Sequence, residues 1–157
     1  MTSTLSDDSG FILEREQLVP GQAAELFEFF ENPQNLLFLT PPRLQFRVLA
    51  SSTPVISQGT TIEYAFKICG VPFKWTSLIS MWNPPYEFMD EQVRGPYRSW
   101  VHHHAFEQTD AGVRTRDRVA YRVIGGALVN RLFVRRELDR IFDHREESLP
   151  KALLERS

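Results

Sequence analysis

Cysteine is nearly absent from this chain of 157 residues, because Cys69 is the single example. One cysteine excludes an internal disulfide bond and suits a reducing compartment, so we expect a cytoplasmic protein. Cys69 lies in a predicted turn with Gly70, and no base stands near it in the sequence. We therefore interpret Cys69 as a small structural side chain and not as a nucleophile.

Long apolar runs, phosphate-binding glycine patterns and an excess of positive charge are also missing. No apolar stretch approaches membrane-spanning length, and residues 1–8 lack the basic and apolar regions of a signal peptide. The eight glycines match neither the dinucleotide-binding nor the Walker pattern, and the net charge of −2 argues against a general nucleic-acid binder. We therefore expect no cofactor, no nucleic acid and no integral membrane segment, and we predict that residues 1–9 form a disordered tail.

Aromatic residues, in contrast, are abundant, with twelve Phe, four Tyr and three Trp. The length suits a single domain, predicted over residues 10–157, that can bury a sizeable core. Most of the rings are expected to fill that core. Their number exceeds what a compact core of this size usually needs, so we predict that some of them line a cavity.

The pattern of apolar residues predicts an α+β fold. A first strand over 11–18 precedes two short helices over 22–30 and 34–39. A long helix over 127–154 closes the chain, and an antiparallel sheet with one apolar face needs this helix as its cover. We therefore predict a curved seven-stranded antiparallel sheet around the long C-terminal helix. The six further strands lie over 44–49, 61–68, 73–81, 86–93, 97–107 and 113–121.

The last two strands form a predicted hairpin around the turn residues 109–112. A loop with an even number of residues gathers the aromatic and histidine side chains on one face and the arginines on the other, whereas a three-residue loop would mix the faces. The clean separation favours the even loop, in which His103 points outward. The resulting cross-strand pairs are Trp100 with Tyr121, His102 with Val119, His104 with Asp117, and Phe106 with Thr115.

Two histidines on the inward face, His102 and His104, allow two chemical interpretations. The His-x-His spacing on a strand points both imidazoles the same way, so Asp117 could be a third metal ligand or could orient one histidine. The alternative is a histidine whose tautomer is fixed by a carboxylate inside a partly polar cavity. We favour this second interpretation and expect no metal, because the chain has no other cluster of metal-ligating residues.

His104 with Asp117 also resembles half of a catalytic arrangement, namely a base with the group that orients it. A nucleophile in a Gly-x-Ser-x-Gly elbow is missing. A histidine acting alone as a proton shuttle, in a cyclisation or a dehydration, stays open as an alternative.

Several stretches of the chain resemble a known superfamily. They are Asn35-Leu36, Leu39-Thr40-Pro41-Pro42, Gly70-Val71-Pro72-Phe73-Lys74-Trp75, Trp82-Asn83-Pro84-Pro85, Gly95-Pro96-Tyr97 and Asp117-Arg118-Val119-Ala120-Tyr121. With the order of elements over residues 11–154, these stretches are similar to the START/Bet v 1-like (SRPBCC) superfamily. Within it, they resemble a bacterial subgroup described as cell-division-inhibitor-like or cyclase/dehydrase-like.

The resemblance implies a helix-grip fold whose cavity, between sheet and helix, takes lipids, quinones, polyketides or other apolar molecules. The superfamily also includes polyketide cyclases and aromatases, so the fold does not decide whether a reaction occurs. Similar domains occur fused to a nucleotide-sugar-epimerase-like domain, which suggests an epimerase-like partner. The register of strand 86–93 is open from the residues alone, and the resemblance favours Asp90 and Gln92 over Met89 and Glu91 as the inward pair.

We therefore expect a protein that binds a small apolar molecule, such as a lipid, a quinone or a polyketide-like compound, in its cavity. The alternative is a cyclase or dehydratase acting on a polyketide-like substrate with a His–Asp pair, for which His104 and Asp117 are the candidates. The residues predicted to contact the ligand are Tyr64, Phe66, Trp75, Ser77, Gln92, Trp100, His102, His104, Phe106, Asp117 and Tyr121.

Overall fold

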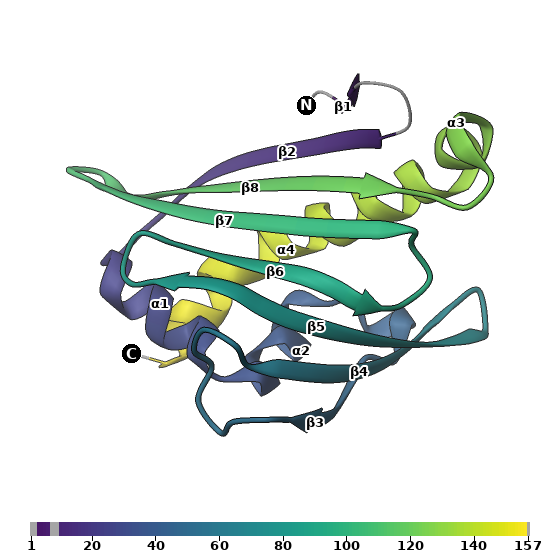
Figure 1. Cartoon of the computed structure of the whole chain (residues 1–157). Coiled ribbons are helices and arrows are strands. Elements are labelled where there is room, and N and C mark those ends of the chain that lie inside the picture. Colours follow the sequence, from purple (N-terminus) through teal and green to yellow (C-terminus); the bar gives the residue numbers. More distant parts are fainter. Residues whose placement is uncertain (1–2, 7–9, 157) are drawn as a thin grey trace.

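The computed structural model describes residues 3–6 and 10–156, and it has the predicted α+β architecture (Figure 1). All strands of this part belong to one antiparallel sheet with the order β1-β2-β8-β7-β6-β5-β4-β3. The seven predicted strands are present. They are β2 (Gly10–Val19), β3 (Arg47–Ser51), β4 (Thr61–Ile68), β5 (Val71–Asn83), β6 (Glu87–Arg94), β7 (Ser99–Thr109) and β8 (Gly112–Arg122).

An eighth strand, β1 (Ser3–Ser6), corrects part of the predicted disordered tail. Its residues pair with Gly10–Leu13 at the start of β2. An edge strand exposes unpaired backbone N–H and C=O groups, and a neighbouring segment of the same chain can satisfy them. Residues 1–2 and 7–9 of the predicted tail lie outside the described residues.

Short helical segments follow β2 and close one end of the sheet, as predicted. The side chain of Asn32 accepts a hydrogen bond from the backbone N–H of Gln34 at 3.0 Å and so caps the N-terminus of the second segment, η1. These segments are α1 (Ala23–Glu31), η1 (Pro33–Asn35), α2 (Leu36–Leu39) and η2 (Pro42–Leu44).

The C-terminal helix is long, as predicted, but it is not uniform. It comprises α3 (Gly126–Val129), a π-helical turn η3 (Asn130–Val134) and α4 (Arg135–Arg156). The buried side chain of Asn130 accepts a hydrogen bond from the Tyr121 hydroxyl at 2.8 Å, which ties the π-helical turn to the sheet. No helix in the described part of the chain is long and apolar enough to cross a membrane.

The β7–β8 hairpin has the predicted register, closed by a two-residue loop between Thr109 and Gly112. His103 lies on the outer face, as predicted. Its Nε2 is 2.9 Å from Glu87 Oε1. Gly112 has a φ of 132°, and a Cβ atom there would collide with the carbonyl oxygen of Val19 on β2. The loop therefore requires glycine at this position.

The core is unevenly distributed beneath the sheet, and that leaves a cavity. Leu138 and Phe142 of α4 pack against β2 and β8, and Leu149 packs in a cluster with α1. A third cluster, under β4 and β5, contains Ile62 and Ile79 but no residue of α4. Helix α4 therefore packs closely under β2 and β8 and leaves space under β4 and β5.

Candidate functional site

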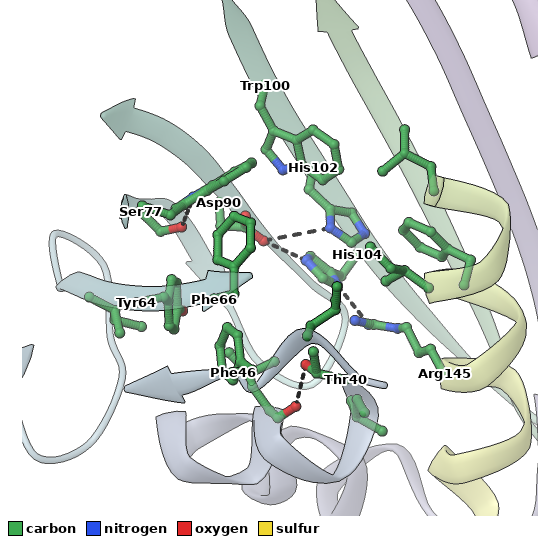
Figure 2. Close-up of a pocket in the computed structure, with 18 of the residues that line it drawn as sticks. Thr40, Phe46, Tyr64, Phe66, Ser77, Asp90, Trp100, His102, His104 and Arg145 are labelled. Atoms are coloured by element: carbon green, nitrogen blue, oxygen red, sulfur yellow. Dashed lines mark hydrogen bonds and ion pairs between the residues drawn. The ribbon is translucent and has the colours of Figure 1, made fainter. Parts of the chain in front are cut away.

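A cavity of about 230 Å³ lies between the sheet and α4 (Figure 2). This volume exceeds by more than tenfold the roughly 10–15 Å³ that one buried water needs, so a small organic molecule fits. Strands β4 to β7 form its floor, and α2 and α4 supply the opposite wall. Ring side chains such as Phe46, Phe66 and Trp75 make the cavity mostly apolar.

Most of the predicted ligand contacts line this cavity. Tyr64 and Ser77 add polar groups to the wall, and the indole N–H of Trp75 donates to Ser77 Oγ at 2.8 Å. Burial and the charge of Asp90 raise the pKa of Tyr64, which therefore presents a neutral hydroxyl. The predicted residues that line the cavity are Tyr64, Phe66, Trp75, Ser77, Trp100, His102 and His104.

Three of the other predicted residues are placed elsewhere by the structure. The Gln92 side chain donates to the carbonyl of Tyr97 at 2.8 Å and accepts from its N–H at 3.1 Å, so it holds the turn between β6 and β7. Phe106 is buried in the core with α1, and Tyr121 bonds Asn130. The sequence pattern put Phe106 and Tyr121 on the inner face of the sheet, and the resemblance put Gln92 there, but neither could show how far along the sheet the cavity extends.

Beside the cavity, two histidines and two aspartates form a buried polar cluster with an arginine of α4, and Figure 2 shows His102, His104, Asp90 and Arg145 of this cluster. His104 Nε2 lies 2.6 Å from Asp90 Oδ2, and His102 Nε2 lies 2.8 Å from Asp117 Oδ1. Arg145 Nη2 is 3.2 Å from His104 Nδ1 and 3.3 Å from Asp117 Oδ1. We call these five residues the His–Asp–Arg cluster.

The histidine–aspartate pairs differ from the predicted one. His104 and Asp117 stand opposite each other on their strands, as predicted, but His104 Nδ1 is 3.3 Å from Asp117 Oδ1, and the shorter contact of His104 is with Asp90. Each carboxylate forms its hydrogen bond diagonally across the strands and not with the histidine directly opposite. Asp90 is opposite His102 but bonds His104. Asp117 is opposite His104 but bonds His102. Asp117 lies behind the histidines, and Asp90 lines the cavity, on the face that the resemblance favoured.

The hydrogen bonds fix the tautomers of both rings. Arginine can only donate, so His104 Nδ1 accepts from Arg145 and His104 Nε2–H donates to Asp90. His102 Nε2–H donates to Asp117, which leaves His102 Nδ1 as an acceptor, 3.9 Å from Asp90 Oδ2. Burial, reinforced by the nearby His104, lowers the pKa of His102 to about 4 despite its bond to Asp117, so His102 is neutral at pH 7.

Both carboxylates of the cluster are ionised at neutral pH. Burial alone would raise the pKa of Asp117, but the charge of Arg145 and the hydrogen bond from His102 hold it well below the usual value. Burial also opposes ionisation of Asp90, yet the hydrogen bond from His104 lowers its pKa. With neutral imidazoles, the cluster carries two negative charges and one positive charge, and the carboxylate without a guanidinium beside it is Asp90.

Arg145 and Asp90 belong to the site, although neither was among the predicted ligand contacts. Arg145 stands in a run of charged residues that resembles a solvated helix face, yet its spacing from Leu138, Phe142 and Leu149 puts it on the apolar stripe of α4. Its guanidinium lies 5.3 Å from the centre of the Phe30 ring. The signal that could have identified Arg145 is its position in the sequence, because it is a charged residue where the helical periodicity predicts an apolar one.

Comparison with known proteins places the fold. No protein-family model matches the chain, and no curated protein matches its sequence significantly. Among solved structures, Ara h 8.0201 is similar with a TM-score of 0.71 and 14% identity, over 93% of this chain and 99% of that one. Major latex-like protein 151 from Panax ginseng is similar with a TM-score of 0.72 and 11% identity, over 94% and 99%.

A third similar structure is the di-domain ARO/CYC StfQ from the steffimycin biosynthetic pathway. Its TM-score is 0.77 with 14% identity, over 94% of this chain and 52% of that protein. At these identities the likeness establishes the fold alone. The chain has the Bet v 1-like helix-grip fold, which is the fold that the sequence resemblance implied.

Proposed function

We propose that this protein binds a small, mostly apolar molecule, such as a lipid, a quinone or a polyketide-like compound, in the cavity between the sheet and α4. The observation that supports the proposal is a cavity with mostly apolar walls that is also lined by buried polar groups of the His–Asp–Arg cluster. Ligand sites in proteins typically combine these two features, because the walls supply contact area and the few polar groups fix orientation.

The His–Asp–Arg cluster would select the ligand by the polar group that the ligand carries. Asp90 and the free Nδ1 of His102 are both acceptors at the cavity wall, so a ligand with a hydroxyl or another donor is complementary to them. A ligand without a donor would leave a buried acceptor unpaired, at a cost of about 1–3 kcal/mol. That cost corresponds to roughly tenfold to more than hundredfold weaker binding.

Occupation of the cavity can be tested with a bulky substitution in its wall. Leu36 of α2 lines the cavity, and its neighbour Leu37 is 43% exposed and does not. In a titration with Nile red, whose fluorescence rises in apolar surroundings, Leu36→Trp should weaken binding at least tenfold, and Leu37→Trp should leave it unchanged. Equal affinities for the wild type and both variants would show that the dye, and by inference the ligand, does not occupy this cavity.

A second candidate function is catalysis of a cyclisation or dehydration on a polyketide-like substrate. It is favoured by one specific observation, namely that His102 is neutral with an acceptor nitrogen at the cavity and a carboxylate on its other nitrogen. Asp117→Asn should then abolish turnover of a poly-β-keto model substrate while ligand affinity changes less than tenfold. Unchanged turnover in this variant would exclude the His–Asp mechanism. The comparisons give no support to an epimerase-like partner, which forms no part of the proposal.

A further inference from the structure

We propose that Asp90, His102 and His104 form a binding site for a divalent transition-metal ion such as Zn²⁺. These residues offer one ligand atom each, all within 4.8 Å of one another. The atoms are Asp90 Oδ2, His104 Nε2 and His102 Nδ1, with the carboxylate oxygen 2.6 Å and 3.9 Å from the two nitrogens. Figure 2 shows both imidazoles directed at this oxygen.

The spacing of these atoms is close to that of a coordination site. Metal–ligand bonds of about 2.0–2.2 Å put neighbouring ligand atoms roughly 3.0–3.4 Å apart. The two observed distances lie on either side of that range, so side-chain shifts of about half an ångström bring the oxygen into place. The His102 and His104 rings are now stacked, with centroids 3.6 Å apart, and rotation about their side-chain bonds would turn the nitrogens to a common point.

The surroundings supply the carboxylate that orients metal-binding histidines. Such histidines almost always donate their second ring N–H to a carboxylate, a carbonyl or water. Asp117 Oδ1 accepts from His102 Nε2 at 2.8 Å, so it already holds the far nitrogen of that ring. It also lies 3.3 Å from His104 Nδ1, which accepts from Arg145 in the metal-free cluster. A metal on His104 Nε2 would displace the proton from that nitrogen, so the ring would carry a proton on Nδ1 toward Asp117 and Arg145 would turn away from it. The sequence pattern allowed Asp117 either as a third ligand or as a group that orients one histidine, and we expected no metal there. The proposed site takes Asp90 as the third ligand and Asp117 as the orienting carboxylate.

The charges of the cluster also favour a cation. Arg145 compensates Asp117, and no guanidinium or ammonium lies within ion-pair distance of Asp90 among the described residues. His102 Nδ1 and Asp90 Oδ2 are two acceptors that face each other with no donor from the described chain between them. Asp90 Oδ2 accepts from His104 Nε2–H in the metal-free cluster, and a metal ion would replace that proton while it also gives His102 Nδ1 a partner.

Such an ion would lie at the wall of the cavity. Three protein ligands leave at least one coordination position open, as in catalytic zinc sites. Asp90, His102 and His104 all line the cavity, so the open position faces the space for a small molecule. The metal could therefore bind an oxygen of a ligand or a water. The metal proposal stands whether or not an apolar ligand binds.

Metal binding can be measured directly on the chelator-treated full chain. Calorimetric titration with Zn²⁺ should show one equivalent bound, and Co²⁺ should produce visible absorption bands of a nitrogen–oxygen site. Asp90→Asn and His102→Gln should each weaken binding at least hundredfold, and Asp117→Asn about tenfold to hundredfold. The matched control is His103→Gln, the neighbouring histidine on the outer face, which should bind like the wild type.

A measurement on the wild type keeps the test valid if a variant does not fold. In ¹H–¹⁵N spectra of the four histidines, Zn²⁺ should shift the ring nitrogens of His102 and His104 and leave those of His103 and His144 in place. Absence of stoichiometric binding would overturn the proposal. Binding that persists in Asp90→Asn, or shifts confined to His103 and His144, would overturn it equally.

Discussion

Replacement of Arg145 by leucine tests the electrostatics of the buried cluster most sharply. The side chains of Arg145 and Asp117 are 12% and 13% exposed, so the substitution leaves a nearly buried carboxylate without its cation. Removal of one partner of a buried ion pair costs about 3–5 kcal/mol. The lower end is expected, because the hydrogen bond from His102 to Asp117 remains. For a domain of this size, 3 kcal/mol lowers Tm by roughly 6–12 °C.

The pH dependence of this loss of stability shows whether Arg145 stabilises the fold through its charge or through its packing. In the wild type, the lowered pKa of Asp117 stabilises the fold fully above pH 3.9 or so, and this stability is lost as the pH falls through the folded pKa. Without Arg145, burial raises the pKa of Asp117, so the variant is penalised while the carboxylate is ionised. The deficit against the wild type should therefore be largest at pH 7 and smaller at pH 4.5.

The assay is urea unfolding at both pH values, followed by tryptophan fluorescence. Arg140→Leu is the matched control, because Arg140 is exposed on the same helix, and its effect should stay within about 0.5 kcal/mol. The double variant Arg145→Leu with Asp117→Asn should recover part of the loss. An equal deficit at both pH values would refute the reasoning and assign the role of Arg145 to its packing on Phe30.

Three further perturbations follow from particular contacts. The wild type should lose up to about 3 kcal/mol of stability between pH 6.5 and pH 4, because the pKa of His102 is about 4 in the folded protein and the imidazole is protonated first in the unfolded chain. In urea titrations, His102→Gln should remove this dependence on pH. Tyr121→Phe should cost about 1–3 kcal/mol in urea unfolding, since it leaves Asn130 without its buried donor, and an unchanged midpoint would contradict that role. Gly112→Ala should lower Tm clearly, because its Cβ meets Val19, and a Tm within 1 °C of the wild type would be contrary to the clash.

The sequence allowed the hairpin to be predicted because strand geometry leaves little freedom. The separation of arginines from aromatic residues favours an even loop over a three-residue loop, and the cross-strand pairs then follow by counting. Trp100 opposite Tyr121 and His104 opposite Asp117 were obtained in this way, and both are present. A different periodicity, apolar residues at three- and four-residue steps, predicted the long helix, whose stripe runs through Leu138, Phe142 and Leu149.

Backbone pairing does not determine which side chains bond, and this limited the prediction of the site. Asp90 and Asp117 each bond the histidine diagonally across from them, which depends on rotamers and not on register. Arg145 comes from α4, whose position over the sheet is set by packing that no local pattern records. The π-helical turn at Asn130 and the pairing of β1 likewise depend on contacts, with Tyr121 and with the start of β2, that the pattern of apolar residues does not record.

Native mass spectrometry of the purified wild-type chain tests the proposed ligand binding most directly. We expect one small molecule bound per chain, released by organic solvent, with a mass that fits an apolar compound bearing at least one hydroxyl or other donor. The cavity predicts the stoichiometry, and the acceptors of Asp90 and His102 in its wall predict this chemistry. A chain that stays bare after incubation with a mixture of lipids, quinones and aromatic polyketides would contradict the proposal.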